Sequence, residues 1–304
     1  MLRRNVLILH TGALGDFVLA WPLVLALGRL HPQSRIIVVT HASKGLLAEA
    51  VLRVESADIE QGWGGLITEG LELQDRPARL VEGAHAIYSF VGASAEHLQK
   101  HAPEAQILSL RTIAPPDFGG HASQWLLEQL LPQPAVRTGV EQMLRSIASR
   151  GVGTGRSHDG DVVIHPGSGS AKKRWPVEKF VELIGRLRQS RRDVRVLLGE
   201  VELEQFTAQQ IRTLESAASV RRPRNYVELL NELRSAGKLI CNDSGPAHLG
   251  AIIGVPTLVL FGPTDPAVWK PLGPNVQVLR HEPLEKLLVS KVVSAMRELT
   301  PQRR

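Results

Sequence analysis

Asn5-Val-Leu-Ile-Leu-His10 opens the stretch that decides the fold class. It continues through the turn Thr11-Gly-Ala-Leu-Gly-Asp16 and an apolar segment at 17–30 to Arg35-Ile-Ile-Val-Val-Thr40. The first and last runs are typical of strands buried on both faces of a parallel sheet. The segment between them is too apolar for a surface helix and predicts a buried one, in which Pro22 predicts a kink or a late start. Strand, glycine-bearing turn, helix and strand in this order predict a doubly wound α/β domain.

The same order recurs in the second half of the chain. Asp161-Val-Val-Ile-His165 predicts a strand, a loop rich in glycine and lysine follows it, and Pro176 suits the start of the next helix. Between the two halves, residues 150–160 are rich in glycine and polar side chains, which indicates a linker. In doubly wound sheets, ligands bind at the carboxyl ends of the strands, where each of these glycine-rich turns lies.

The domain organisation follows from this repeat. We predict two Rossmann-like domains that face a cleft, at 1–155 and 156–304. An amphipathic helix is expected at 284–299, and it is a candidate for packing across the two domains.

Composition limits the partners. The chain carries a formal net charge of +6, which favours nucleic acid, an anionic membrane surface or phosphorylated substrates. The basic residues are dispersed and aromatic residues make up only 4%, so stacking platforms are scarce and we expect no nucleic-acid partner. No apolar run approaches the roughly 20 residues that span a bilayer. We expect a cytoplasmic protein, and the single cysteine, Cys241, agrees with this because it allows no internal disulfide.

The turn Asn242-Asp-Ser-Gly-Pro-Ala-His-Leu249 is a candidate phosphate cradle. It follows an apolar run typical of a buried strand, Pro246 suits the first position of a helix, and Gly254 suits the residue just past its end. Small residues let a ligand approach the backbone, and N–H groups at a helix start favour an anion. An ordinary capped turn between strand and helix is the alternative interpretation.

Two further elements are candidates for the same chemistry. The loop Ser168-Gly169-Ser170-Ala171-Lys172-Lys173 offers N–H groups, hydroxyls and ammonium groups that suit a diphosphate; a solvated basic loop is the alternative. Asp16 lies at the start of the first helix, where an acidic residue is commonly a cap. A carboxylate that is fixed and ionised there also suits a general base.

Other nucleotide and metal motifs are not supported. The first turn is Gly-x-x-Gly, which lacks the dinucleotide fingerprint, and no Gly-Lys-Ser/Thr of a P-loop occurs in the chain. Asp159-Gly160-Asp161 has the form of a metal-binding acidic pair, but it precedes a strand and is interpreted as linker charge. We therefore expect neither a metal nor a cofactor.

Three blocks of the sequence form a pattern that spans most of the chain. They are Ile8-Leu-His-Thr-Gly-Ala-Leu-Gly-Asp16 with Pro22 after it, His165-Pro-Gly-Ser168 through Lys173-Arg-Trp-Pro176, and Asn242-Asp-Ser-Gly-Pro-Ala-His-Leu249 through Phe261-Gly-Pro-Thr-Asp-Pro266. In these blocks the chain resembles glycosyltransferase family 9, the heptosyltransferases of the lipopolysaccharide inner core. The resemblance implies a GT-B fold. It also implies that the C-terminal domain holds a nucleotide sugar, typically ADP-heptose, and that the N-terminal domain holds a lipid-linked glycan acceptor.

The resemblance also implies roles for single residues. Asp16 corresponds to the catalytic base and Lys173 to the phosphate ligand, while Glu202 or Glu204 would hold the nucleotide ribose; the spacing does not decide between the two. Gly169 stands where some members have a second hydroxyl. The other donor-binding residues implied are Ser168, Ser170, Asp243, Ser244, Gly245 and His248, and the acceptor-side residues are Thr11, Gly12 and Gly15.

The implied reaction is an inverting, metal-independent transfer. Asp16 would take the proton of an acceptor hydroxyl, which attacks the anomeric carbon from the face opposite the diphosphate. Lys173 and the helix start at Ser244 would hold the charge of the leaving group in place of a metal. A basic protein would then be drawn to the inner face of the cytoplasmic membrane. The alternatives are a non-hydrolysing sugar-nucleotide epimerase, a catalytically silent nucleotide-sugar binder, or a transferase acting on capsule or another glycan.

Overall fold

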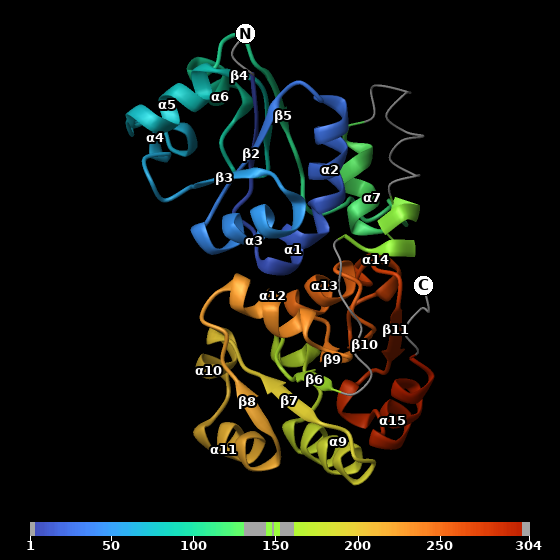
Figure 1. Cartoon of the computed structure of the whole chain (residues 1–304). Coiled ribbons are helices and arrows are strands. Elements are labelled where there is room, and N and C mark those ends of the chain that lie inside the picture. Colours follow the sequence, from blue (N-terminus) through green and yellow to red (C-terminus); the bar gives the residue numbers. More distant parts are fainter. Residues whose placement is uncertain (1–3, 131–143, 148, 153–160, 300–304) are drawn as a thin grey trace. The chain divides into compact units, whose positions relative to one another are not determined.

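The computed structural model describes residues 4–130, 144–147, 149–152 and 161–299. The chain forms two compact units, Met1–Leu144 and Arg145–Arg304, each with parallel strands and helices between them (Figure 1). The sequence-based domain boundary at 155 lies outside the described residues, as do Asp159 and Gly160.

A parallel sheet forms the centre of the first unit. Its described strands lie in the order β3-β2-β1-β4-β5. β1 is the central strand and is buried along its whole length, which explains its uninterrupted apolar sequence. The strands are β1 (Asn5–Leu9), β2 (Arg35–Thr40), β3 (Glu55–Asp58), β4 (Ala84–Ser89) and β5 (Gln106–Ser109).

The helices of the first unit cover this sheet. The predicted interruption near Pro22 is confirmed: one helix ends at Leu19 and the next begins at Trp21, with the proline in its first turn, where a missing N–H is tolerated. The helices are α1 (Leu14–Leu19), α2 (Trp21–Leu30), α3 (Ala42–Leu52), α4 (Gly64–Ile67), α5 (Asp75–Glu82), α6 (Ala95–His101) and α7 (Ala122–Glu128).

The second unit repeats this plan. Its described strands lie in the order β11-β10-β9-β6-β7-β8, all parallel. The first strand, β6, therefore has β7 on one side and β9 on the other, and the winding reverses between β6 and β9, as in dinucleotide-binding sheets. The strands are β6 (Val162–His165), β7 (Val194–Leu197), β8 (Ser219–Arg221), β9 (Lys238–Asn242), β10 (Thr257–Phe261) and β11 (Val276–Arg280).

The final helix of the second unit packs within that unit. It begins at Val289, later than the expected 284, because Leu284–Lys286 forms a separate 3-10 turn. Val292 and Met296 join Phe180 in the core of this unit. The helices are α9 (Val177–Gln189), α10 (Glu200–Gln205), α11 (Ala208–Ala217), α12 (Tyr226–Arg234), α13 (Gly245–Ile252), α14 (Pro266–Trp269) and α15 (Val289–Glu298). Within the described ranges, no helix has the length and apolar character needed to cross a membrane.

Candidate functional site

The basic loop and the Asp243 turn meet at the switch point of the second sheet. β6 and β9 are neighbours, with His165 at the end of β6 paired in register with Cys241 of β9. The chain leaves β6 into residues 166–174 and leaves β9 into Asp243 and Ser244. The fold therefore brings two predicted elements together that lie some 70 residues apart in the sequence.

Asn242 binds both ends of the basic loop to β9. Its side chain is fully buried; Oδ1 accepts a hydrogen bond from the backbone N–H of Trp175 at 3.0 Å, and Nδ2 donates to the carbonyl of Pro166 at 2.7 Å. The loop thus has a fixed course without a strand or helix of its own. The motif contained Asn242, but we did not predict it as a site residue. The signal was available, because an amide at the end of a buried strand needs partners.

Lys173 and Asp243 form the polar centre of this site. The Lys173 ammonium donates to Oδ2 of Asp243 at 2.9 Å, and the hydroxyl of Thr264, after β10, donates to the same oxygen at 2.8 Å. The Asp243 side chain is only 6% exposed, whereas Lys173 is 32% exposed. The carboxylate is thus enclosed by donors, and the ammonium keeps a face open to solvent. Thr264 was not among the predicted site residues.

The predicted hydroxyl and glycine positions of the loop differ in exposure. Ser168 is buried and its Oγ donates to the backbone carbonyl of Asp243 at 2.8 Å, which leaves the oxygen lone pairs for another donor. Gly169 and Ser170 are exposed, and Lys172 points to solvent, unlike its neighbour Lys173. Of the predicted loop residues, Ser168 and Lys173 therefore contact the Asp243 turn directly.

Glu202 lies against the site and Glu204 is exposed on the same helix. One oxygen of Glu202 accepts the backbone N–H of Gly199 at 2.8 Å and lies 3.4 Å from Nε2 of His165. Burial alone would raise the pKa of Glu202, but the imidazole and the hydrogen bonds lower it to about 2. The carboxylate also lies directly over Gly167, where any side chain would overlap it. Of the two glutamates, Glu202 is thus the one that contacts the loop and His165.

The Asp243 turn leads into a helix as the sequence predicts. Ser244 is the N-cap of α13, Gly245 its first residue, and Pro246 lies in the first turn. Ser244 Oγ donates to the carbonyl of Asn242 at 3.1 Å and lies 3.4 Å from Nδ1 of His165. His248 is buried in the first turn of the helix. The positive end of the helix dipole thus lies beside Lys173, which suits an anion.

In the first unit, Asp16 is the third residue of α1, and the N-cap is Ala13. Asp16 is therefore not the N-cap of this helix, although its place in the first turn is favourable for a negative charge. The turn before it is tightly packed: a Cβ on Gly12 would lie 2.9 Å from Cε1 of His10 and 3.3 Å from Cβ of Asp16. Thr11 is exposed and Gly15 is half-buried.

The ammonium of Lys44 also reaches this turn. Its Nζ donates to the backbone carbonyls of Thr11 at 3.1 Å and Gly12 at 2.6 Å. We did not predict a role for Lys44 from the sequence. No local pattern marks it, since its partners precede it by 33 and 32 residues.

The acidic pair in the linker is only partly described. Asp161 ends it and lies 3.6 Å from the guanidinium of Arg195. Among the described residues, no group of three or more His, Cys, Asp or Glu side chains is arranged to hold a metal ion.

Residues 122–296, more than half of the chain, match the model of glycosyltransferase family 9 (heptosyltransferase). The chain belongs to glycosyltransferase family 9. The matched range includes the whole site of the second unit, from His165 to Thr264, while Asp16 and Lys44 precede it.

Known relatives of this family 9 chain agree with that assignment. Lipopolysaccharide heptosyltransferase 1 of Escherichia coli K12 is 31% identical over 118 residues, which are 38% of this chain and 36% of that protein. The alignment thus spans about a third of the relative's length.

Two solved structures support the fold. The family 9 glycosyltransferase of Veillonella parvula aligns with 98% of this chain and 98% of its own, with 18% identity and a TM-score of 0.71. E. coli heptosyltransferase WaaC, solved with ADP, aligns with 97% of this chain and 100% of its own, with 17% identity and a TM-score of 0.68. Together with the two doubly wound sheets, these likenesses confirm the predicted GT-B fold.

Proposed function

We propose that this family 9 protein transfers a sugar from a nucleotide sugar, with ADP-heptose as the expected donor, to a lipid-linked glycan such as the lipopolysaccharide core. The observation that carries the proposal is the convergence of Lys173, Ser168 and the start of α13 on Asp243 at the switch point of the second sheet. The similarity to a heptosyltransferase solved with ADP supports an adenine nucleotide as the leaving group.

The second unit holds the donor. The Lys173 ammonium and the N-terminus of α13 stabilise the diphosphate, whose negative charge grows as the bond to the sugar breaks. Asp243 does not need to touch the phosphates for this purpose. It orients the ammonium, which is held at 2.9 Å, so that little reorganisation is needed when the diphosphate binds.

Glu202 is the ribose ligand in this proposal. Its pKa of about 2 keeps it ionised at neutral pH, and a carboxylate is a strong acceptor for a pair of sugar hydroxyls. Gly167 leaves room for the carboxylate at the edge of the loop. Glu204 is exposed and takes no part.

The first unit holds the acceptor, and Asp16 is the general base. It accepts the proton of the acceptor hydroxyl while that oxygen forms a bond to the anomeric carbon and the bond to the diphosphate breaks. Attack from the face opposite the leaving group inverts the configuration. Because Lys173 and α13 supply the positive charge at the diphosphate, the reaction proceeds without a divalent metal.

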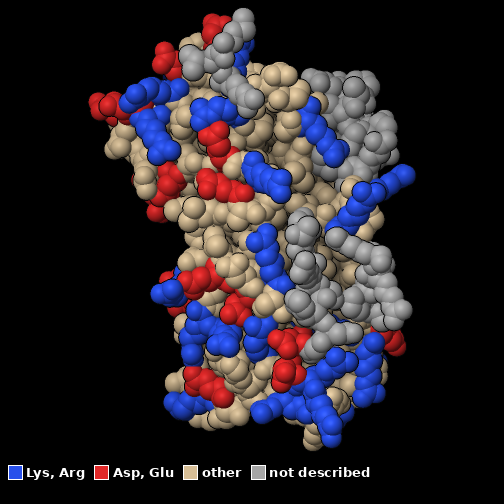
Figure 2. All heavy atoms as spheres, in the orientation of Figure 1, with Lys and Arg blue, Asp and Glu red and all other residues tan. Residues whose placement is uncertain are grey.

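In this proposal the lipid-linked acceptor lies at a membrane surface, where the protein must reach it. Basic side chains are spread over the second unit with acidic ones among them (Figure 2), and α15 carries Lys291 and Arg297. Dispersed positive charge gives a weak, salt-sensitive attraction to anionic lipid, which suits a peripheral protein at the inner face of the cytoplasmic membrane. Sedimentation with anionic vesicles that weakens as salt rises is the expected result.

Two measurements test the function. In a thermal-shift screen, ADP and ADP-heptose should raise the melting temperature, while UDP and NAD should not. In a transfer assay, Asp16→Asn should lower kcat by roughly 10²–10⁴. Asp75→Asn removes a first-turn acid from another helix of the same unit and should leave the rate unchanged.

A protein without an adenine-nucleotide response would contradict the donor assignment. Parental transfer by Asp16→Asn would contradict the assignment of the base. Full activity is expected in excess chelator, and activity that returns only with added divalent metal would contradict the metal-independent mechanism.

A further inference from the structure

Lys44 is a buried cation with no role in the function proposed so far. It is the third residue of α3 and only 6% exposed, although an ammonium in the interior loses its hydration. Lysine is rarely buried to this extent unless it is paired, so its partners explain why the fold keeps it there.

Those partners are the turn that carries the proposed base. Nζ donates to the carbonyls of Thr11 and Gly12, at 3.1 and 2.6 Å, and these residues lie between β1 and α1. Two hydrogen bonds from one charged group fix the course of this glycine-containing segment, which lies outside the described strands and helices. The same ammonium interacts electrostatically with the carboxylate of Asp16.

The turn is packed so that a shift of its backbone would move Asp16. Gly12 lies between the imidazole of His10 and the Asp16 side chain, at contact distances that leave no room for a Cβ. His10 is itself enclosed by the rings of Phe17 and Phe90. Lys44 therefore binds a segment whose position is also fixed by the packing of His10 against two aromatic rings.

We propose that Lys44 is a positioning residue for catalysis: it fixes the turn before α1 that leads to Asp16, and its positive charge interacts with the Asp16 carboxylate. This inference rests on the proposed function, in which Asp16 is the base. It adds a residue outside the family-matched range 122–296 and outside the three blocks that carry the family resemblance.

The charges around the turn give the direction of the effect. A nearby cation stabilises a carboxylate and lowers its pKa. Burial lowers the pKa of Lys44, and Asp16 raises it again, so the two groups stabilise each other in their charged forms. Burial, together with Lys44, lowers the pKa of His10 to about 4, so His10 is neutral at pH 7 and adds no charge.

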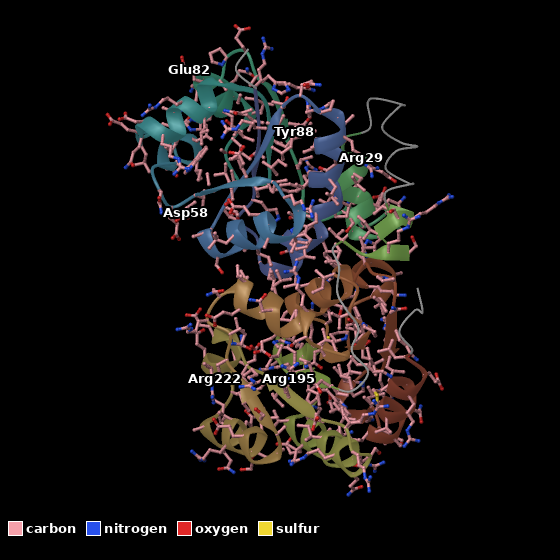
Figure 3. All side chains as sticks on the ribbon, in the orientation of Figure 1. Arg29, Asp58, Glu82, Tyr88, Arg195 and Arg222 are labelled. Carbon is pink, nitrogen blue, oxygen red and sulfur yellow. The ribbon has the colours of Figure 1, made fainter. Side chains whose placement is uncertain are left out.

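Other titratable groups lie on neighbouring elements at the same edge of the sheet. His41 precedes α3 and pairs with Glu60 at 3.2 Å, and Asp58, labelled in Figure 3, ends β3 and binds the backbone N–H of Glu60. His121 precedes α7, which is tied to α1 by the hydrogen bond from Ser123 to the Leu19 carbonyl. The titratable groups named here on the turn itself and on these neighbouring elements are thus His10, His41, Lys44, Asp58, Glu60 and His121.

The test compares Lys44→Met and Lys44→Gln with the parent in the full-length protein. The methionine removes charge and donors, while the glutamine keeps a donor for the turn carbonyls and removes only the charge. In both variants the acidic limb of the kcat against pH profile should move up by about one pH unit, because Asp16 loses a stabilising cation. In Lys44→Met kcat at its plateau should also fall about 10- to 100-fold, because the base is displaced.

Two controls separate this role from a structural one. Lys100→Met removes an exposed lysine of the same unit and should change neither the acidic limb nor the plateau of the kcat against pH profile. The KM for the nucleotide sugar should stay within about twofold in every variant, since the donor is held by the second unit. Lys44→Arg retains the charge and should restore the position of the acidic limb.

The outcomes distinguish this inference from the proposed function. If Asp16→Asn is inactive but both Lys44 variants keep the parental limb and plateau, the role of Lys44 is refuted and the base stands. If Asp16→Asn is fully active, the base assignment is refuted instead. If Lys44→Met is too unstable to assay, Lys44→Gln decides: an unmoved limb in that variant overturns the electrostatic role.

Discussion

The ammonium of Lys173 lies 2.9 Å from Oδ2 of Asp243, a residue 70 positions further along the chain. A carboxylate in a phosphate site would repel its ligand if it faced the ligand directly. Here the hydroxyl of Thr264 and the ammonium both donate to the same oxygen of Asp243, and its side chain is almost fully buried. The buried Asp243 carboxylate therefore holds the Lys173 ammonium in place, and the partly exposed Lys173 side chain presents the positive charge to solvent.

The lysine pair of the loop offers a matched test of this arrangement. Lys173→Met should weaken ADP binding about 10- to 100-fold, since a hydrogen bond between charged groups contributes about 1.5–3 kcal/mol. Lys172→Met removes a neighbouring but exposed ammonium and should change the affinity less than about twofold. Isothermal titration calorimetry at one salt concentration measures both. Equal losses in the two variants would mean that only the overall charge of the loop matters.

Two glycines of the same loop should respond differently to substitution by alanine. Gly167→Ala places a methyl group on the Glu202 carboxylate, which must swing away from His165 and from the Gly199 N–H. The melting temperature should fall and nucleotide binding should weaken. Gly169→Ala has no atom within 4 Å of its new methyl group and should match the parent in both measurements.

These two glycines also separate a local effect from a general one. If Gly169→Ala loses binding to the same extent as Gly167→Ala, the cause lies in loop flexibility and not in displacement of Glu202. If Gly167→Ala binds nucleotide as the parent does, Glu202 has no role in binding.

Much of the fold could be predicted from sequence because its signals are local. The apolar run at β1, the proline in α2 and the glycine turns each mark an element without reference to the rest of the chain. The region between α3 and α7 was harder to predict. β3 (Glu55–Asp58) is an edge strand of four residues with little apolar character, and α5 is short and mostly polar. Neither segment therefore shows a clear hydrophobic periodicity in the sequence.

The site was predictable where a motif is contiguous and not where contacts are long-range. Lys173 and Asp243 each lie in a recognisable segment, but that they form an ion pair depends on the order of β6 and β9 in the sheet. The spacing could not decide between Glu202 and Glu204, because the choice depends on which face of α10 meets the loop. Lys44 reaches its carbonyl partners only through the pairing of β1 and β2, and no local pattern reveals that.

Acid should destabilise the second unit through Glu202. Its pKa in the folded protein, about 2, is below the ordinary value of 4.5, so its ionised form stabilises the fold above that ordinary value. This contribution is lost as the pH falls from about 4.5 toward 2. The difference in melting temperature between the parent and Glu202→Gln should therefore be constant above about pH 5 and shrink toward about pH 3.

Glu204→Gln is the matched control for this titration, since it changes an exposed carboxylate on the same helix. It should melt within a degree or so of the parent, since exposed substitutions shift stability by only about 0.5 kcal/mol or less. A difference between the parent and Glu202→Gln that stays constant down to about pH 3 would show that the Glu202 charge does not stabilise the fold.

Asn242 should be the most sensitive position for the stability of the site. Asn242→Ala leaves the N–H of Trp175 and the carbonyl of Pro166 without their partner in a fully buried place. Each unsatisfied group costs about 1–3 kcal/mol, so we expect the two together to lower the free energy of unfolding by about 2–6 kcal/mol. Denaturant unfolding followed by tryptophan fluorescence measures it, because Trp175 itself is buried beside the change.

One further variant keeps only half of the Asn242 amide, and a second variant is a control at an exposed asparagine. Asn242→Asp retains an acceptor for the Trp175 N–H but cannot donate to Pro166 when ionised, so it should be destabilised as well. Asn231→Ala changes an exposed asparagine on α12 and should unfold as the parent does.

Because the amide holds both ends of the loop that carries Lys173, Asn242→Ala should also weaken ADP binding under conditions where the protein is still folded. Parental ADP affinity in that variant would show that the loop keeps its course without Asn242.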